Sequence, residues 1–408
     1  MNIKRSLIIP IISMLSIASI LGACSSEEEG QTTIEVWAMG EEGNLLNQLV
    51  DQFEEEHEDI KVQVQPIPWD QAHEKLLTAT ASGNGPDVLQ LGTTWVPEFA
   101  EAGILLDLSP YLEEYPDFAN SNYFDGAVES TEYEGKRVGV PWYVETRVLY
   151  YRTDLLAEVG YEQAPQNWDE LKDVATKLTA QGDHVFGYDI DMNDAIVPVI
   201  FAWQNGNDFI VDGKPDVRSD AFAEALEFYV SFFEEGLASS SGQIEIIQAF
   251  KEGIKPIFQS GPWMIRQINE QAPEIEGDWS VAVLPEKENN LSVMGGANLS
   301  IFHNSDKVDE SLTFISFLND VDTQIEWFGI ANSLPSRMDA WDSPELQATE
   351  QLTVIGDQML NTKASPQITQ WDSLHNEIVR MVEKIVVGGA DFDEELEAFR
   401  VKVDEMFD

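Results

Sequence analysis

The sequence predicts an α/β protein of two domains. Its 408 residues are enough for two domains of about 100 to 200 residues each. Beyond residue 30, short apolar stretches alternate with stretches of helical spacing, which favours a mainly parallel sheet with helices on its faces. Residues 140–151 join two apolar strands through Glu145 and Arg147, which project from the same side, as expected at a crossing between domains. The stretch is also consistent with one long strand of a single domain that carries an exposed charge pair.

The amino terminus has the pattern of an export signal. Lys4 and Arg5 precede an apolar run over residues 7–21, and small residues follow it. A transmembrane helix is the weaker alternative, because the run is short for a membrane span and Pro10 interrupts it. Residues 1–23 are therefore expected to be a signal peptide that is removed.

Cys24 is the only cysteine of the chain and follows this cleavage site directly. Residues 21–24, Leu-Gly-Ala-Cys, resemble the lipobox of bacterial lipoproteins, in which the cysteine becomes the amino terminus and carries two or three acyl chains. Two chains are enough for stable membrane anchoring. The polar, acidic residues 24–33 are then expected to form a flexible tether.

The chain is strongly acidic, with 74 Asp and Glu against 23 Lys and Arg and a formal net charge of −51. Such a charge repels nucleic acid and anionic lipid. Hydrophobic residues make up 43% of the chain, so the charge is expected on the surface of a folded protein. Adaptation to saline or alkaline surroundings would explain it, and a polycationic ligand is the alternative.

Three tryptophans lie at or near the ends of the first three predicted strands. Trp37 ends the first and Glu41 follows it, Trp69 follows the second, and Thr94 and Trp95 follow the third. Ligands of α/β sheets bind beyond the carboxyl ends of the strands, so the shared position favours a binding site over packing of each indole alone. These strands are predicted at residues 33–37, 60–64 and 87–91, with helices at residues 45–53 and 71–81.

The second part of the chain continues with helices and strands whose ends carry clear signals. Asn167 and Glu170 form the capping box of a helix, and Pro262 at a first helical turn places Trp263 at a strand-to-helix junction. Helices are predicted at residues 153–159, 167–178, 195–203, 221–234, 244–251, 312–318, 322–328, 345–359, 368–387 and 394–406, and strands at 185–188, 257–258, 278–284 and 291–302.

Three short motifs partly match known phosphate or metal sites, but each lacks a required feature. The glycine-containing residues 82–87 precede a strand and no Lys follows, unlike a phosphate loop. Residues 189–194 begin like a calcium loop, but Asp194 replaces the glycine and Ile200 the bidentate glutamate. Leu77 stands where a zinc motif starting at His73 needs histidine. No metal or cofactor is expected.

Several short motifs together resemble one family. They are Gly-Pro-Asp-Val at 85–88, Pro-Trp-Tyr-Val-Glu at 141–145, Ser-Gly-Pro-Trp at 260–263, Gly-Gly-Ala-Asn at 295–298 and Leu-Pro-Ser-Arg at 334–337. With the lipobox, they are similar to the extracellular solute-binding lipoproteins of ABC importers, in the group that includes maltodextrin- and multiple-sugar-binding proteins.

The resemblance implies a bilobal α/β fold of the periplasmic-binding-protein type, with a ligand cleft between lobes that are discontinuous in sequence. Residues 31–144 and 293–335 are expected in the first lobe, and residues 145–290 and 340–408 in the second. Ligand would be delivered to the transmembrane subunits of an ABC permease by a monomer anchored through Cys24 on the extracytoplasmic side of the cell membrane.

The resemblance also implies site residues. Tyr143 and Glu145 match the crossing segment that contacts ligand, Trp263 matches a sugar platform, and the glycine motif matches a loop beside the hinge. Trp203 and Trp371 correspond to cleft aromatics by position only. The full set of candidate ligand-binding residues is Trp37, Glu41, Trp69, Thr94, Trp95, Trp142, Tyr143, Glu145, Trp203, Trp263, Gly295, Gly296, Asn298, Arg337 and Trp371.

The residue types fit a carbohydrate ligand. Sugar rings have apolar faces that lie on indole, while their hydroxyls pair with carboxylates, amides and guanidinium groups. Several indoles favour an oligosaccharide. Two alternatives remain open. One is a binder of a polyamine or other small solute, which the acidity of the chain permits. The other is a secreted glycoside hydrolase, which needs a pair of carboxylates, although a chain with 74 Asp and Glu residues contains such pairs by chance.

Overall fold

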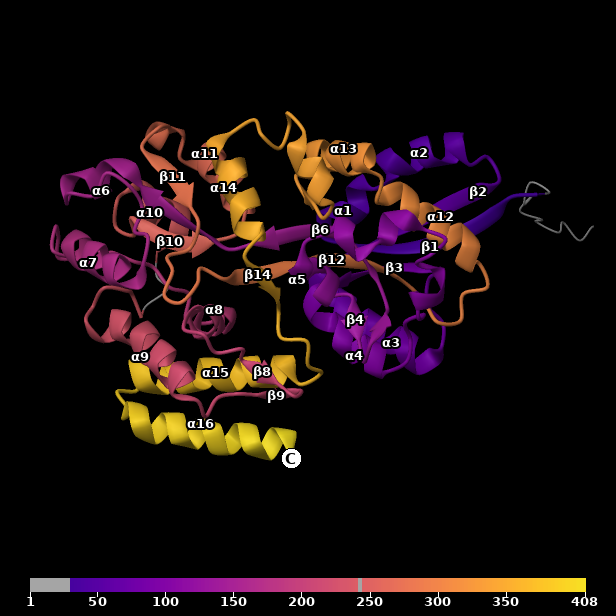
Figure 1. Cartoon of the computed structure of the whole chain (residues 1–408). Helices are drawn as coiled ribbons and strands as arrows, with labels where there is room; N and C mark the ends of the chain where they lie inside the picture. Colours follow the sequence, from indigo (N-terminus) through magenta and orange to yellow (C-terminus); the bar gives the residue numbers. More distant parts are fainter. Residues whose placement is uncertain (1–29, 241–243) are drawn as a thin grey trace, which may run out of the picture.

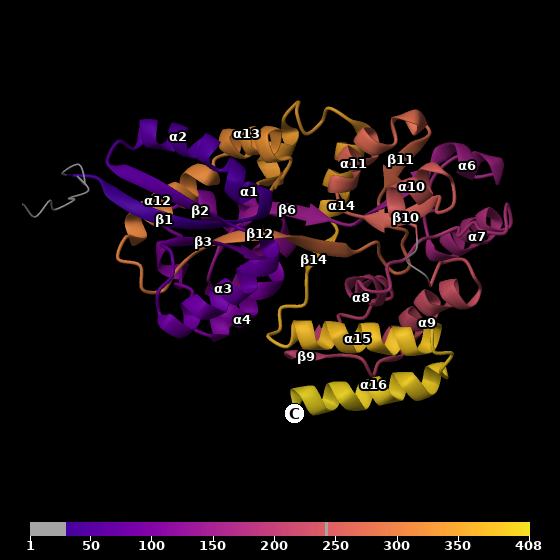
Figure 2. The same ribbon diagram turned by 180° about the vertical axis from the view of Figure 1, so that it is seen from behind.

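Two β-sheets of different size organise the computed structural model, which describes residues 30–240 and 244–408. The predicted signal peptide, Cys24 and most of the predicted tether lie outside the described residues. Figures 1 and 2 show two lobes, the first built around the larger sheet and the second around the smaller one. This bilobal α/β architecture confirms the predicted fold class.

The larger sheet has seven strands within the described part of the chain. β1 pairs in parallel with β2 and β3, as predicted, but β12 runs antiparallel to both β3 and β6. The sheet is therefore mixed and not mainly parallel, because the chain re-enters it from the second lobe. The order is β13-β6-β12-β3-β1-β2 with β14 beside β12, and the bounds are β1 Thr32–Met39, β2 Ile60–Ile67, β3 Val88–Gly92, β6 Val140–Thr146, β12 Ser292–Ile301, β13 Leu334–Pro335 and β14 Thr362–Ala364.

The smaller sheet consists of β7 (Val148–Arg152) between β10 (Ile257–Ser260) and β11 (Trp279–Ala282), all antiparallel. Only Arg147 separates β6 from β7, although the two strands pair in different sheets. Residues 140–151 are therefore a crossing between sheets and not one continuous strand of a single domain. Two short ribbons complete the strands: β4 (Glu132–Tyr133) with β5 (Lys136–Arg137), and β8 (Ile210–Val211) with β9 (Lys214–Pro215).

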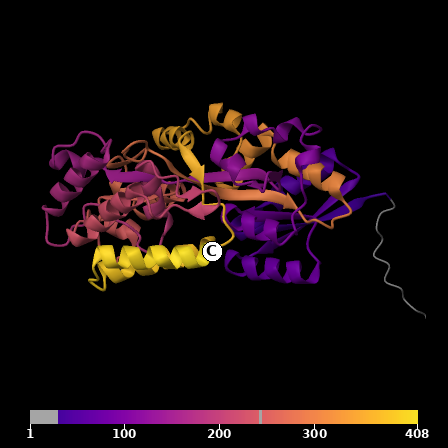
Figure 3. The ribbon, with the colours of Figure 1, turned by 60° about the horizontal axis from the view of Figure 1, so that its bottom comes forward.

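Helices cover both sheets and bury a core in each lobe. Those of the first lobe are α1 Gly40–Leu45, α2 Asn47–Glu56, α3 Trp69–Ser82, α4 Val96–Glu101, α5 Asp125–Glu129, α12 Val308–Leu318 and α13 Val321–Ala331. Those in or beside the second lobe are α6 Thr153–Glu158, α7 Trp168–Thr179, α8 Ile196–Gln204, α9 Asp220–Glu234, α10 Ile246–Lys251, α11 Trp263–Gln271, α14 Glu350–Met359, α15 Trp371–Val386 and α16 Phe392–Phe407. In Figure 3, the yellow α15 and α16 lie side by side along one side of the second lobe.

Most helices and strands predicted from local sequence signals are present in the structure. The Asn167 side chain accepts a hydrogen bond from the Glu170 amide at 2.9 Å and caps α7, as predicted. The strand predicted at residues 185–188 is wrong: the segment lacks ladder pairing, and only the next residue, Asp189, forms an isolated bridge with Phe258. A Cβ on Gly187 would lie 2.0 Å from the Ala175 carbonyl oxygen, so the segment passes directly against α7, and Tyr188 is buried without strand pairing.

Candidate ligand-binding cleft

A cavity of about 1000 Å³ lies between the lobes, and both lobes line it. The first lobe contributes α1, the amino end of α3, the turn after β3 and the end of α13, while the second contributes the amino ends of α8, α11 and α15. β6 and β12 pass beneath it, and Figure 1 shows both strands running from one lobe to the other. This volume is at the upper end of the range for small-molecule sites.

Ten of the fifteen predicted site residues line this cavity. Trp263, at the start of α11 in the second lobe, and Glu145, on β6, both line it. The ten are Glu41, Trp69, Thr94, Trp95, Tyr143, Glu145, Trp263, Gly295, Gly296 and Trp371. The alternation of side chains along β6 explains part of this set, since Tyr143 and Glu145 lie on one side of the strand, while the intervening Val144 belongs to the core and only borders the cavity.

The first-lobe wall carries a pair of indoles. The rings of Trp69 and Trp95 are 5.5 Å apart between centroids and inclined by 60°. Gly40 lies directly against Trp69, because a Cβ at this position would be 2.5 Å from the indole. Trp69 retains 36% of its surface exposed, so the pair offers an open aromatic face.

The second-lobe wall carries two further indoles. Trp263 is the first residue of α11, and the Tyr150 hydroxyl fixes the turn before it by donating to the Gly261 carbonyl at 2.7 Å. Trp371 opens α15 and is only 6% exposed, so it presents little more than an edge. His375 packs edge-on against that indole, with 5.9 Å between centroids. Aromatic rings therefore face the cavity from both sides.

Carboxylates and a phenol supply polar partners on the first-lobe side. Burial raises the pKa of Glu145, and the guanidinium of Arg147 partly opposes this rise. Burial also raises the pKa of Glu42, whose carboxylate accepts a hydrogen bond from the Ser333 hydroxyl at 3.3 Å. The pKa of Tyr143 lies well above its usual value because of burial and the nearby carboxylates, so the phenol stays neutral. These groups can accept from and donate to ligand hydroxyls.

Five predicted site residues do not line the cavity, and three of them are tryptophans. Trp37 lies two residues before the end of β1 and is buried with Lys75 against its ring. Trp142 points to the opposite side of β6 from Tyr143 and stacks on Trp327 at 5.3 Å in the first-lobe core. Trp203 lies at the carboxyl end of α8, about 10 Å along the axis from the end that reaches the cavity, and is buried in the second-lobe core.

The other two residues outside the cavity lining are polar and have structural partners. Asn298 is 1% exposed and donates to the Ser130 carbonyl at 3.0 Å, next to a register shift at which Trp142 is the extra residue on β6. Arg337 forms two hydrogen bonds with Asp339, at 2.8 and 3.1 Å, and donates to the Asn319 carbonyl. Both side chains stabilise the first lobe.

Several cavity residues were absent from the predicted set. Arg147 continues the alternation of Tyr143 and Glu145, and Arg266 and His375 follow Trp263 and Trp371 by one helical turn, so spacing could have indicated all three. Glu42 and Ser333 carried no sequence signal, because their positions depend on how α1 meets the segment before β13. The missed polar residues of the cavity include Glu42, Thr93, Arg147, Asp194, Arg266, Ser333 and His375.

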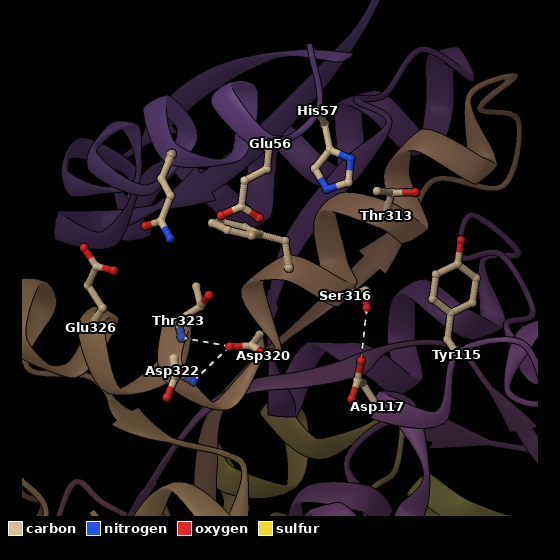
Figure 4. Close-up of a pocket in the computed structure, with 12 residues that line it drawn as sticks. Glu56, His57, Tyr115, Asp117, Thr313, Ser316, Asp320, Asp322, Thr323 and Glu326 are labelled. Atoms are coloured by element: carbon tan, nitrogen blue, oxygen red, sulfur yellow. Dashed lines mark hydrogen bonds between the residues drawn. The ribbon is translucent and has the colours of Figure 1, made fainter. Parts of the chain in front are cut away.

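A second hollow of about 510 Å³ opens on the first lobe, between α2, α12 and the start of α13 (Figure 4). Two of its acidic side chains have structural roles: Asp320 caps α13 by accepting from the amides of Asp322 and Thr323, and Asp117 contacts Ser316 and Arg337. It lacks paired aromatic faces and involves only one lobe. The cavity between the lobes is therefore the candidate site.

Within residues 30–240 and 244–408, no group of three or more His, Cys, Asp or Glu is arranged to hold a metal ion. None of the helices in these ranges is long and apolar enough to cross a membrane.

Comparisons with known proteins agree on one family. The family described as bacterial extracellular solute-binding protein matches residues 38–325. The structure of the sugar-binding protein MalE from Xanthomonas citri superposes with a TM-score of 0.87 and 34% identity, covering 92% of this chain and 97% of that one. A solute-binding protein from Thermotoga lettingae bound to α-D-tagatose gives a TM-score of 0.77 and 25% identity over 93% of this chain and 100% of that one.

Curated relatives extend over most of the chain as well. The galactooligosaccharide-binding protein of Bacillus subtilis is 22% identical, with coverage of 91% of this chain and 90% of the relative. The diacetylchitobiose-binding protein DasA of Streptomyces coelicolor is 25% identical over 74% of each chain. The predicted resemblance is confirmed, and the chain belongs to the family of bacterial extracellular solute-binding proteins.

Proposed function

We propose that this protein is the substrate-binding component of an ABC importer and captures an oligosaccharide between its two lobes. The observation that carries the proposal is the cavity that both lobes share, in which Trp263 faces the region of Glu145, Trp69 and Trp95. Opposed indoles with carboxylates between them match the two faces of a sugar, apolar C–H surface and hydroxyl rim. Relatives described as binding galactooligosaccharide, diacetylchitobiose and maltotriose support this ligand class.

The aromatic surface is sufficient for useful affinity. Covering half of an indole removes roughly 100 Å² from water, worth about 2.5 kcal/mol at ~25 cal/mol/Å². Two or three such contacts plus hydrogen bonds, less the cost of association, reach the roughly −8 kcal/mol of micromolar binding. The walls carry four indoles, so more than one sugar ring can be stacked.

The cellular context follows from the amino-terminal motifs. We propose that residues 1–23 direct export, that Cys24 is lipidated, and that the predicted tether at residues 24–33, whose last two residues already belong to β1, links a monomer to the extracytoplasmic face of the membrane. We also propose that the lobes divide at the predicted boundaries, that bound sugar passes unchanged to the permease subunits, and that the cleft performs no hydrolysis. Release of shorter sugars when the purified protein is incubated with oligosaccharides would instead favour the glycoside hydrolase alternative.

A thermal-shift screen followed by calorimetry tests the proposal. A panel of maltotriose, galactotriose, diacetylchitobiose and spermidine is expected to show an increase in Tm with a sugar, because a ligand that prefers the folded state stabilises it. Trp263→Ala should then weaken binding by more than about 1 kcal/mol, roughly fivefold or more. Trp203→Phe, a matched change outside the cavity, should leave affinity unaltered. Stabilisation by spermidine alone would contradict the carbohydrate assignment.

A further inference from the structure

The guanidinium of Arg147 occupies the face of Trp263 that lines the cleft. Its central carbon is 4.9 Å from the ring centroid, and both residues line the cavity. Arg147 is the single residue between β6 and β7, so its backbone is held by two sheets while its side chain reaches the second-lobe wall. The platform on which a sugar ring would stack is thus covered by a side chain of the protein itself.

The contacts that hold Arg147 in this place are weak. Besides the indole, its terminal nitrogen makes a single contact of 3.3 Å with the Asp194 carboxylate, and the side chains of both partners are partly exposed. A cation over an aromatic ring in such surroundings changes an equilibrium constant by only about 2- to 5-fold. A long, single contact also lacks the bidentate geometry that strengthens Arg–carboxylate pairs.

The indole, in contrast, is held in place. A Cβ on Gly261 would lie 2.0 Å from the six-membered ring of Trp263, so the backbone of the preceding turn packs directly against it. Tyr150 fixes that turn through the Gly261 carbonyl at 2.7 Å. When a ligand ring takes the exposed face, the flexible side chain of Arg147 therefore moves and the indole stays.

Two carboxylates are available to the displaced guanidinium. Asp194 is already in contact, and its other oxygen accepts from the Ile196 amide at 3.2 Å, which holds the carboxylate at the amino end of α8. Glu145, two residues earlier on the same side of the chain, is close enough for its charge to interact with that of Arg147. The charge of Arg147 thus keeps a partner after it leaves Trp263.

We propose that Arg147 is an affinity-determining cover of the Trp263 subsite: a ligand ring binds there only by displacing the guanidinium from the indole toward Asp194 and Glu145. The inference rests on the proposed capture of a sugar in this cleft. It predicts that Arg147 lowers the affinity for sugar. Only ligands whose ring gains more free energy from stacking on Trp263 than is lost with the cation–π contact bind at this subsite.

Calorimetry on Arg147→Ala and Arg147→Gln tests the inference, using whichever of maltotriose, galactotriose and diacetylchitobiose binds the wild-type protein. Both variants should bind the sugar about 2- to 5-fold more tightly, because the ligand ring no longer has to displace a cation–π contact. In a Trp263→Ala background the same changes should not tighten binding. Lys177→Ala is the matched control, because Lys177 also lies over a ring, Tyr161 at 5.1 Å, and pairs with Asp173, but outside the cleft.

A measurement without ligand tests the cover itself. The indole N–H resonance of Trp263, identified by its loss in Trp263→Ala, should shift in Arg147→Ala and remain in place in Lys177→Ala. Weaker or unchanged sugar binding in both Arg147 variants, or an unshifted resonance, would overturn the inference while leaving sugar capture intact. Failure of the wild-type protein to bind all three sugars would instead count against the proposed function.

Discussion

Replacing three glycines of the cleft by alanine, one at a time, gives a graded test of its geometry. Gly296 has φ of +117°, and a Cβ there would lie 2.2 Å from the Tyr143 carbonyl oxygen of β6. At Gly295 the nearest atom would be the Glu145 carboxylate oxygen at 3.0 Å. Gly329, near the end of α13, also lines the cavity but has no atom within 4 Å of a Cβ. The three positions therefore differ in what an added methyl group meets.

The structure sets the order of the three effects. Gly296→Ala should cost about 1–3 kcal/mol for the strained φ and about 1–3 kcal/mol for forcing β6 and β12 apart, roughly 2–6 kcal/mol together. Gly295→Ala should cost about 0.5–1.5 kcal/mol, because the Glu145 side chain can change rotamer. Gly329→Ala should stabilise by up to about 1 kcal/mol, since alanine replaces glycine within a helix.

Urea unfolding followed by circular dichroism measures these differences. The midpoint is expected to rise for Gly329→Ala, to fall moderately for Gly295→Ala and to fall most for Gly296→Ala. Calorimetry with a bound oligosaccharide should show weakened binding for Gly295→Ala, because its methyl group displaces the Glu145 carboxylate. A Gly296→Ala protein as stable as Gly329→Ala would refute the close approach of β6 and β12 beneath the cleft.

Three further predictions concern stability and anchoring. Glu42→Gln should raise Tm at pH 7, because burial raises the pKa of Glu42 in the folded protein and its ionised form therefore destabilises the fold above that pKa. The gain in Tm should disappear near pH 4, where Glu42 is protonated in both the folded and the unfolded protein. Arg337→Ala should destabilise by about 1–3 kcal/mol, because Asp339 and the Asn319 carbonyl lose their donor, with sugar affinity retained; loss of binding without loss of stability would restore Arg337 to the site. Cys24→Ala should release the protein from the membrane fraction, and continued detergent-extractable anchoring would contradict lipidation.

Short motifs and strand ends predicted much of the candidate site. Tyr143 and Glu145 were predicted because their segment resembles the crossing segment of the family, and Trp69 and Trp95 because they follow strand ends at the edge of a sheet where ligands bind; all four line the cavity. Trp37 does not line the cavity, because β1 continues to Met39 and leaves the indole inside the strand. Trp142 does not line it either, because it is adjacent to Tyr143 and its side chain therefore lies on the opposite side of β6.

The amino-acid sequence by itself determined the α/β class, the order of most helices and strands, the crossing at residues 140–151 and the family motifs. These are encoded by periodicity, capping residues and short motifs, each of which acts within a few positions along the chain. Only the tertiary structure decided which aromatic side chains face the cleft and which fill a core. It alone brought Arg147 to Asp194, 47 positions away, and to Trp263, because such contacts depend on how the two lobes pack around the crossing.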